Sequence, residues 1–243
     1  MKTMKLCDLH THVLPGVDDG APEMEYALQM LRNAVASDVE LLAVTPHCNR
    51  PCGTRNFLDD HLYNGFLQLQ QAAKEIPVRL VLGAEVFADQ DLPELLMQKK
   101  IPTINGGRYL LTEFPVDACP EYFQDLLQRI LELGYIPLIA HPERYRAVCK
   151  MPQIVVPWLN MGCHLQLTGG SIMGAYGKTV QRAATFLLQN DLVACVASDA
   201  HSLHHRSNFL LDVYDHLCLR YSKQYARCLM YENPMDICCD NDI

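Results

Sequence analysis

Histidine and carboxylate residues recur in this sequence at the points where short apolar runs end. They fall in the segments DLHTH (8–12), TPH (45–47), GAE (83–85), TEFP (112–115), AHPER (140–144) and SDAH (198–201). Imidazole and carboxylate ligands without cysteine favour Mn, Fe or Zn over thiolate-bound metals and over a simple Mg or Ca site. The pattern predicts a metal-dependent hydrolase and does not select among the three metals.

Spacing within two of these segments adds a geometric constraint. His10 and His12 are two residues apart, as are Asp199 and His201, so on a strand each pair points to the same side. Any one such residue alone is more often a hydrogen-bonded structural group or a helix cap. Several of them at the ends of buried strands would be costly without a cation or a partner. Their joint occurrence therefore indicates a metal cluster.

The apolar runs that carry these residues read as strands alternating with helices. Strands are predicted at 5–9, 40–45, 78–85, 109–113, 136–140, 164–168 and 193–198, and helices at 23–37, 58–75, 92–99, 122–133, 153–161 and 178–189. Nearly continuous apolar runs are typical of parallel strands buried on both faces. Seven strand-helix units predict an α/β fold, either a closed barrel or a doubly wound sheet, in which the carboxyl ends of the strands share one face.

Length and composition limit the class of protein. With 243 residues, 49% of them hydrophobic, we expect one domain over 1–231, followed by a mobile acidic tail at 232–243. A net charge of −8 without a basic run argues against nucleic-acid binding. No window approaches the roughly 20 apolar residues of a membrane span, and the N-terminus does not resemble a signal peptide. We therefore expect a cytoplasmic protein.

The cysteines do not supply a nucleophile by sequence pattern. There are eleven, an odd number at irregular spacing, so most are expected to be reduced core residues, while Cys238 and Cys239 are expected to be exposed. Thiol-dependent tyrosine phosphatases need an arginine six residues after the cysteine, and no cysteine here has one. If the protein is a phosphatase, water is the expected nucleophile.

Longer motifs in the same segments resemble a known superfamily. The chain is similar to the PHP (polymerase and histidinol phosphatase) proteins, and more closely to their branch of bacterial tyrosine-protein phosphatases from capsule and exopolysaccharide loci. The likeness runs from about Leu6 to Arg206 through DLHTHVLPGVDDGA, AVTPH, LVLGAEVF, YLLTEFP, PLIAHPERY, QLTGGSIMGAYGK and VASDAH. It implies a distorted seven-stranded (β/α)7 TIM-like barrel.

The resemblance also implies a set of metal ligands. Three divalent ions are expected, Mn first and Fe or Zn as alternatives. One would be held by His10, His12, Glu85 and Asp199; a second by Glu85, Glu113 and His141; and a third by Asp19, His47 and His201. Asp18 is assigned only the capping of the GVDDG turn.

Function follows from the same resemblance. Metal-bound hydroxide would attack the phosphorus atom, with Arg144 and Arg206 as clamps for the phosphoryl oxygens. The implied partner is the phosphotyrosine tail of a bacterial tyrosine kinase that controls polysaccharide export. A histidinol-phosphate or other small phosphomonoester phosphatase, and a non-catalytic metal-binding regulator, stay open as alternatives, as does the oligomeric state. Aromatic residues that could line a substrate groove are more simply read as core: Phe57, Tyr63, Phe66, Tyr122 and Phe123.

Overall fold

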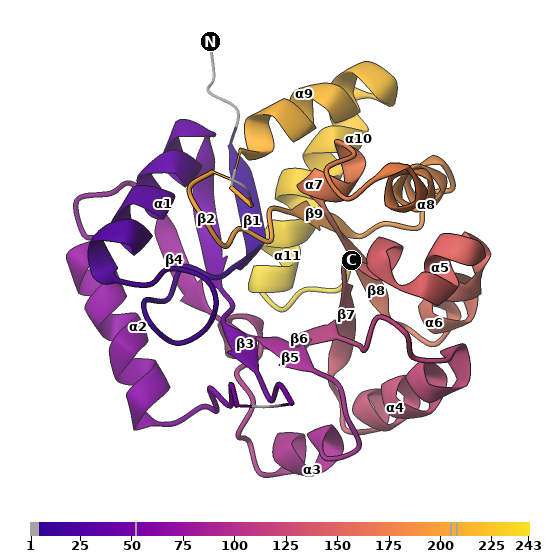
Figure 1. Ribbon diagram of the computed structural model, residues 1–243, viewed down its shortest axis with the longest axis horizontal. Helices are drawn as coiled ribbons and strands as arrows, with labels where there is room; N and C mark the ends of the chain where they lie inside the picture. Colours follow the sequence, from indigo (N-terminus) through magenta and orange to yellow (C-terminus); the bar gives the residue numbers. More distant parts are fainter. Residues whose placement is uncertain (1–4, 52, 205, 208) are drawn as a thin grey trace.

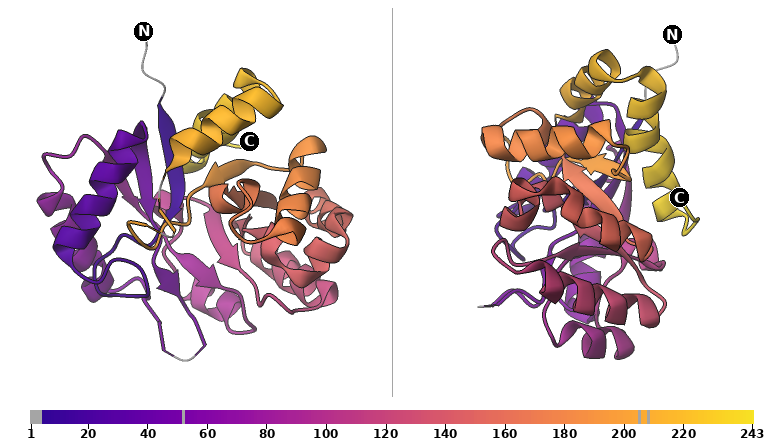
Figure 2. Two further views of the ribbon diagram at one scale, coloured as in Figure 1. Left: turned by 45° about the horizontal axis from the view of Figure 1, so that its top comes forward. Right: turned by 90° about the vertical axis from the view of Figure 1, so that its right-hand side faces the viewer.

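The computed structural model describes residues 5–51, 53–204, 206–207 and 209–243. Parallel strands occupy the centre of this part of the chain, and helices surround them (Figure 1, Figure 2). The strands are β1 (Leu6–Thr11), β2 (Val39–Val44), β3 (His47–Cys48), β4 (Arg79–Leu82), β5 (Glu85–Phe87), β6 (Tyr109–Glu113), β7 (Ile136–Ala140), β8 (His164–Thr168) and β9 (Cys195–Ala197). The expectation of a parallel α/β fold is confirmed.

Helices follow most strands along the chain. The longer ones are α1 (Met24–Ala36), α2 (Asp60–Ala72), α4 (Pro120–Glu132), α8 (Lys178–Gln189) and α9 (Leu210–Arg220). The shorter ones are α3 (Leu92–Met97), η1 (Ile104–Gly106), η2 (Pro142–Arg144), α5 (Arg146–Lys150), η3 (Pro152–Val155), α6 (Val156–Asn160), α7 (Gly169–Ile172), α10 (Lys223–Arg227), η4 (Cys228–Glu232) and α11 (Asn233–Cys238). The single helix predicted at 153–161 is thus divided into η3 and α6, each of which has a proline in its first turn.

The strands form two sheets rather than the closed seven-stranded barrel that the resemblance implied. Among the described residues, one sheet has the order β1-β2-β4 and the other the order β3-β5-β6-β7-β8-β9. A single parallel bridge between Thr11 and Ala200 links β1 to the segment just after β9. Nine strands occur among the described residues because the chain is interrupted twice: β3 follows an interruption just beyond the predicted strand 40–45, and β5 follows one inside the predicted strand 78–85.

The two interruptions differ in character. Pro46, which has no backbone N–H to donate to a ladder, separates β2 from β3. Gly83 separates β4 from β5, but its N–H still donates to the carbonyl of Val44 at 2.9 Å, and the N–H of Glu85 donates to the carbonyl of Pro46 at 3.1 Å. Hydrogen bonds therefore still connect the neighbouring segments across the second interruption.

Alternating side chains divide the core into two hydrophobic clusters. In β2, Leu42 and Val44 pack in the larger cluster with residues of the outer helices, whereas Leu41 and Ala43 pack in a smaller one. The smaller cluster collects residues from β1, β2, β4, β6, β7 and β9. Opposite faces of the same strands thus fill the space inside the strand array and the space beneath the helices.

The C-terminal segment corrects one expectation. Residues 232–243, predicted to be a mobile tail, include α11, whose Ile237 is fully buried in the smaller cluster. Beyond it, Asp240 accepts a hydrogen bond from the backbone N–H of Arg108 (2.7 Å), and the hydroxyl of Tyr109 donates to the carbonyl of Asn241 (2.8 Å). Acidic composition suggested a solvated tail, but buried apolar residues and the ion pair with Arg108 hold it against the beginning of β6.

The described cysteines are reduced, as expected, but only half of them are buried, fewer than the expected majority. All ten described cysteines are free, and five of them are buried. Cys238, expected to be exposed, is buried in α11, whereas Cys239 is exposed. No helix among the described residues is both long enough and apolar enough to cross a membrane.

Candidate metal centre

Four predicted ligands meet at the end of β1. The Nε2 atoms of His10 and His12 are 3.2 Å apart, and each lies 3.3 Å from Oε2 of Glu85. Oδ1 of Asp199 lies 3.4 Å from Nε2 of His10 and 3.6 Å from Nε2 of His12. Ligands about 2.1 Å from a tetrahedral metal are about 3.4 Å from one another. The four side chains therefore have the spacing that one divalent cation requires.

Glu85 turns its second oxygen to a second group. Its Oε1 lies 2.7 Å from Nε2 of His141, and Oε1 of Glu113 lies 4.0 Å from the same nitrogen. Glu85 is 1% exposed and Glu113 is 12% exposed at the side chain. One carboxylate thus faces two groups of donors, which is the arrangement of a bridging ligand.

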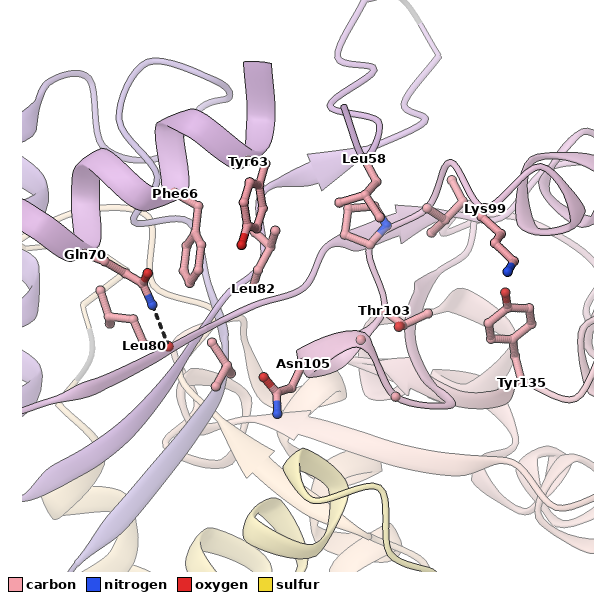
Figure 3. A pocket seen from close by; sticks show the side chains of 15 residues that line it. Leu58, Tyr63, Phe66, Gln70, Leu80, Leu82, Lys99, Thr103, Asn105 and Tyr135 are labelled. Carbon is pink, nitrogen blue, oxygen red and sulfur yellow. Dashed lines mark hydrogen bonds between the residues drawn. The ribbon is translucent and has the colours of Figure 1, made fainter. Parts of the chain in front are cut away.

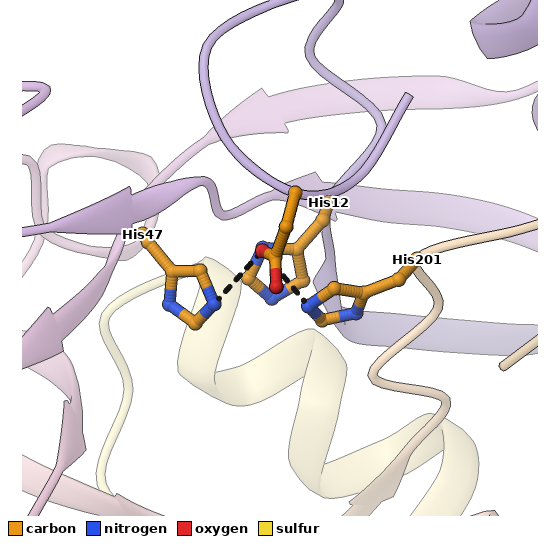
Figure 4. Close-up of side chains that lie close together, drawn as sticks. His12, His47 and His201 are labelled. Carbon is orange, nitrogen blue, oxygen red and sulfur yellow. Dashed lines mark ion pairs between the residues drawn. The ribbon is translucent and has the colours of Figure 1, made fainter. Parts of the chain in front are cut away.

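A third group is built from Asp19, His47 and His201. Oδ1 of Asp19 lies 3.3 Å from Nε2 of His47 and 3.5 Å from Nε2 of His201, and Figure 4 shows the two imidazoles approaching from different segments beside His12. The other ring nitrogen of His47 lies 2.9 Å from Oε2 of Glu85. This group is contiguous with the other two, and its Asp19 side chain is 59% exposed, so it is open to solvent.

Hydrogen bonds orient three of the imidazoles. Nδ1 of His10 lies 2.9 Å from Oε1 of Gln166, Nδ1 of His12 lies 2.8 Å from Oδ2 of Asp18, and Nδ1 of His201 lies 3.0 Å from the carbonyl of Asp199. An N–H at Nδ1 leaves Nε2 as the free acceptor, as in metal-binding histidines. All three Nε2 atoms face the ligand groups described above.

Asp18 and Gln166 contact the imidazoles of predicted ligands, a role that the sequence reasoning assigned to neither residue. Asp18 does accept from the backbone N–H of Gly20 (2.9 Å), as expected of a turn cap, but it also accepts from the backbone N–H of His47 (2.9 Å) and binds His12. The available signals were the doubled aspartate of GVDDG and a glutamine inside an otherwise apolar strand.

The loop that carries Asp18 and Asp19 lies directly on the end of β1. A Cβ atom at Gly20 would lie 2.0 Å from the carbonyl oxygen of His12, so only glycine fits there. Two of the predicted ligands also have left-handed backbone angles, His141 with φ 36° and Asp199 with φ 55°. Strain of this kind in non-glycine residues costs roughly 1–3 kcal/mol and is concentrated at functional sites.

Unpaired buried atoms test whether these residues fit a metal. Six side-chain atoms of the predicted ligands are buried without a hydrogen bond among the described residues, although Nδ1 of His47 lies 2.9 Å from Oε2 of Glu85. They are Glu85 Oε2, Asp199 Oδ1, Glu113 Oε2, His47 Nδ1, His141 Nδ1 and His201 Nε2. Orphaned buried polar atoms each cost about 1–3 kcal/mol or more. Since several converge on the same small volume, cations fit the site.

The predicted ligands differ in the direction of their pKa shifts. Burial opposes protonation of His12, but its hydrogen bonds with Asp18 and Glu85 raise its pKa to about 10. Burial opposes ionisation of Glu85, but the field of His10 and hydrogen bonds from the surrounding imidazoles hold its pKa well below the usual range. Burial likewise opposes ionisation of Asp199, yet His10 and Arg144 lower its pKa. Burial and the nearby charge of His12 lower the pKa of His201 to about 2. The two carboxylates are therefore ionised and His201 is a neutral imidazole.

Both predicted arginine clamps lie beside the ligands. The Nη2 atoms of Arg144 and Arg206 each donate to Oδ2 of Asp199 at 2.6 Å. The Nε atoms of both arginines are buried without a hydrogen-bond partner among the described residues. Asp199 thus presents one oxygen to the histidines and the other to two guanidinium groups.

A separate cavity of about 560 Å³ lies between α2, β4 and η1 (Figure 3). Its lining includes Tyr63 and Phe66 and none of the nine predicted ligands. Of the five aromatic residues that could have lined a substrate groove, Phe66 and Phe123 are buried core residues. This cavity is therefore separate from the group of predicted ligands at the strand ends.

The fold and the side chains define an α/β protein with a candidate metal centre at the carboxyl ends of its parallel strands. The family model for capsular polysaccharide synthesis proteins CpsB/CapC matches residues 6–239. The chain belongs to the CpsB/CapC family.

Curated relatives match nearly the whole chain. The tyrosine-protein phosphatase CpsB of Streptococcus pneumoniae is 33% identical over 242 residues, covering 97% of this chain and 99% of that protein. The tyrosine-protein phosphatase YwqE of Bacillus subtilis is 31% identical over 208 residues, covering 83% of this chain and 80% of that protein. The resemblance to this branch of phosphatases is confirmed.

Two solved structures resemble the fold of this chain. One from a study of YwqE and CpsB, described as metal-dependent tyrosine phosphatases, superposes with a TM-score of 0.91 at 29% identity, over 98% of this chain and 96% of that one. A phosphotriesterase homology protein from Escherichia coli superposes with a TM-score of 0.59 at 11% identity, over 95% and 96% of the two chains, which is a likeness of fold alone.

Proposed function

We propose that this protein is a metal-dependent protein-tyrosine phosphatase whose substrate is the phosphotyrosine tail of a bacterial tyrosine kinase that regulates capsular or exopolysaccharide synthesis. The observation that carries the proposal is the position of Glu85, whose two oxygens face two adjoining groups of imidazole and carboxylate donors. Membership of the CpsB/CapC family supports the tyrosyl substrate.

The proposed ligand groups are those of the resemblance. His10, His12, Glu85 and Asp199 would hold one divalent ion; Glu85, Glu113 and His141 a second; and Asp19, His47 and His201 a third. Manganese is the first choice, and iron and zinc suit the same donors. Bound in this way, the metals would supply an acidified water as the nucleophile and Lewis-acid stabilisation of the phosphoryl group.

The arginines supply fixed donors beside this centre. Arg144 and Arg206 share Oδ2 of Asp199 through their Nη2 atoms, which leaves their buried Nε–H groups without a hydrogen bond among the described residues. We assign these Nε–H groups to the phosphoryl oxygens. Charge-assisted donors of this kind are most effective where water is excluded, and the Arg144 side chain is 18% exposed. A phenolate leaving group, with a pKa of about 10, needs less protonation than an alkoxide, so the site can act on phosphotyrosine without a dedicated general acid.

The two sheets are proposed to act as one distorted barrel of seven strand segments. The chain itself joins β2 to β3 and β4 to β5, and the bridge from Thr11 to Ala200 closes the other junction. Counted in this way, the seven segments each deliver at least one residue to the strand-end face.

Phosphate release tests the proposal. Three substrates would be compared, a phosphotyrosine peptide, histidinol phosphate and a phosphodiester, before and after chelation and after Mn²⁺ is restored. Activity that is lost with chelator, regained with Mn²⁺ and highest on the peptide is expected. Activity on histidinol phosphate alone would assign a small phosphomonoester instead, and no activity with any metal would favour a metal-binding regulator.

The arginine roles are tested separately. Arg144→Ala is expected to lower kcat/KM by roughly 10²-fold or more while the metal content stays that of the unmodified protein. Loss of metal in this variant would contradict the assignment of Arg144 as a clamp.

A further inference from the structure

The Arg144 guanidinium lies over the ring of Tyr176. The central carbon of that guanidinium is 4.2 Å from the centroid of the Tyr176 ring. Tyr176 belongs to the turn between α7 and α8, and its ring rests on Gly170, where a Cβ atom would be 3.0 Å from the ring carbon Cε2. Absence of a side chain at Gly170 therefore lets the ring approach Arg144.

Buried polar groups hold the other side of Arg144. Its Nη2 donates to Asp199 (2.6 Å) and to Oγ1 of Thr168 (3.2 Å). The Thr168 hydroxyl is itself fixed by Oε1 of Glu143 (3.0 Å) and lies 2.8 Å from the hydroxyl of Ser171. Glu143, Thr168 and Ser171 are all fully buried. One edge of the guanidinium is therefore fixed by hydrogen bonds that cannot readily rearrange.

The hydrogen bonds of Nη2 alone leave the Arg144 guanidinium free to rotate, and the Tyr176 ring restricts this rotation. Hydrogen bonds from Nη2 do not prevent the guanidinium from pivoting about that atom, which would swing its Nε–H and Nη1 groups. The Tyr176 ring opposes this motion because rotation of the guanidinium away from the ring breaks the cation–π contact. Among the described residues no aromatic ring covers Arg206, whose side chain is also more exposed, at 32% against 18% for Arg144.

We propose that Tyr176 is a positioning residue that acts through Arg144: its ring holds the guanidinium so that the unpaired Nε–H of Arg144 points to the phosphoryl group before substrate arrives. This inference rests on the proposed function, since it assumes that Arg144 binds phosphate. Arg144 is then the preformed clamp, and Arg206 is the one that adjusts.

Three single variants distinguish the effect of the Tyr176 ring from that of its hydroxyl and from the effect of losing a tyrosine elsewhere in the protein. Tyr176→Phe keeps the ring, Tyr176→Leu removes it at similar volume, and Tyr63→Leu removes a half-exposed tyrosine of the distant cavity in Figure 3 as the matched control. For the phosphotyrosine peptide, Tyr176→Leu is expected to lower kcat/KM roughly 2- to 30-fold, the range of a partly desolvated cation–π contact. Tyr176→Phe and Tyr63→Leu are expected to match the unmodified protein.

A double-mutant cycle tests whether Tyr176 acts through Arg144. In the Arg144→Ala background, Tyr176→Leu should have little further effect on kcat/KM, because the group that the ring positions is gone. An equal loss in both backgrounds would overturn the proposal. So would a loss in Tyr176→Phe as large as that in Tyr176→Leu, since the hydroxyl rather than the ring would then be responsible.

A second readout does not depend on activity. In the ¹⁵N NMR spectrum of the full chain carrying Zn²⁺, which is diamagnetic, the Nε–H signal of Arg144 can be assigned from its loss in Arg144→Lys. Hydrogen exchange of this signal should be slow in the unmodified protein and in Tyr176→Phe, and faster by a similar 2- to 30-fold factor in Tyr176→Leu. Unchanged exchange in Tyr176→Leu overturns the inference and leaves the proposed function standing. Absence of phosphotyrosine hydrolysis in the unmodified protein removes the proposed function, while this measurement still decides whether the ring holds Arg144.

Discussion

Oδ2 of Asp18 lies 2.8 Å from Nδ1 of His12 and also accepts the backbone N–H of His47 at 2.9 Å. One buried carboxylate thus contacts two predicted ligands. His12 lies 6 residues before Asp18 in the sequence, and His47 lies 29 residues after it. Burial opposes its ionisation, but the hydrogen bond with His12 lowers the pKa of Asp18 to about 2. Asp18 is therefore charged throughout the pH range in which the protein would be assayed.

Asp18→Asn is expected to weaken metal binding without removing a ligand. The amide keeps the shape of the side chain but loses the charge that fixes the His12 ring, and loss of such a partner costs roughly 10- to 100-fold in metal affinity. Competition with a fluorescent chelator measures this affinity. Asp117→Asn, which changes an exposed aspartate paired with Arg146, is the control and should bind metal as the unmodified protein does. Equal affinity for all three proteins would leave Asp18 with its turn-capping role only.

Glu85 and Asp19 should differ in how many metals they control. Asp19 contributes to one group of donors, whereas Glu85 contributes to two. Asp19→Ala is therefore expected to lower the bound metal from three ions per chain to two, and Glu85→Ala to one or none, with activity falling roughly 10²-fold or more in each. Elemental analysis of the purified variants counts the ions. The same loss from both variants would show that the groups bind metal all together or not at all.

The position of the predicted ligands at the carboxyl ends of parallel strands could be predicted from the sequence. The residues that orient these ligands could not. Six segments were predicted to converge because parallel strands present their carboxyl ends on one face, and they do. The bond between His10 and Gln166 joins positions 156 residues apart, so it depends on which side chains meet across the finished fold. The close approach of Ile104 to Gly83 likewise joins distant segments. Local patterns predict elements and their ends, whereas contacts between distant segments decide how the side chains are oriented.

Thiol chemistry should be restricted to exposed cysteines. Burial raises the pKa of Cys48 and of Cys163 to about 12, and since the thiolate is the reactive form, neither should react between pH 7 and 9. Cys119 and Cys239 are exposed and should be alkylated by iodoacetamide, faster as the pH rises. Peptide mapping by mass spectrometry identifies the labelled positions, and activity should survive because no thiol is the nucleophile. Rapid labelling of Cys48, next to the ligand His47, together with loss of activity would contradict both expectations.

The C-terminal segment should contribute to stability although it lies away from the ligands. Ile237 is fully buried in the same cluster as Cys7 and Cys195 of the strand array, so Ile237→Ala should lower the free energy of unfolding by about 2–5 kcal/mol. Ile243→Ala, at a residue that is 37% exposed, is the control and should change it by less than about 0.5 kcal/mol. Urea unfolding of the two variants measures the difference.

The size of that difference decides between two views of residues 232–243. A mobile tail makes no persistent contacts, so both substitutions would be equally harmless. If α11 closes the end of the strand array near the start of β6, where Asn105 donates to the carbonyl of Cys238 at 2.9 Å, only Ile237→Ala destabilises the fold. Its metal content, measured below the unfolding transition, should then equal that of the unmodified protein, because the ligands stand at the opposite, carboxyl ends of the strands.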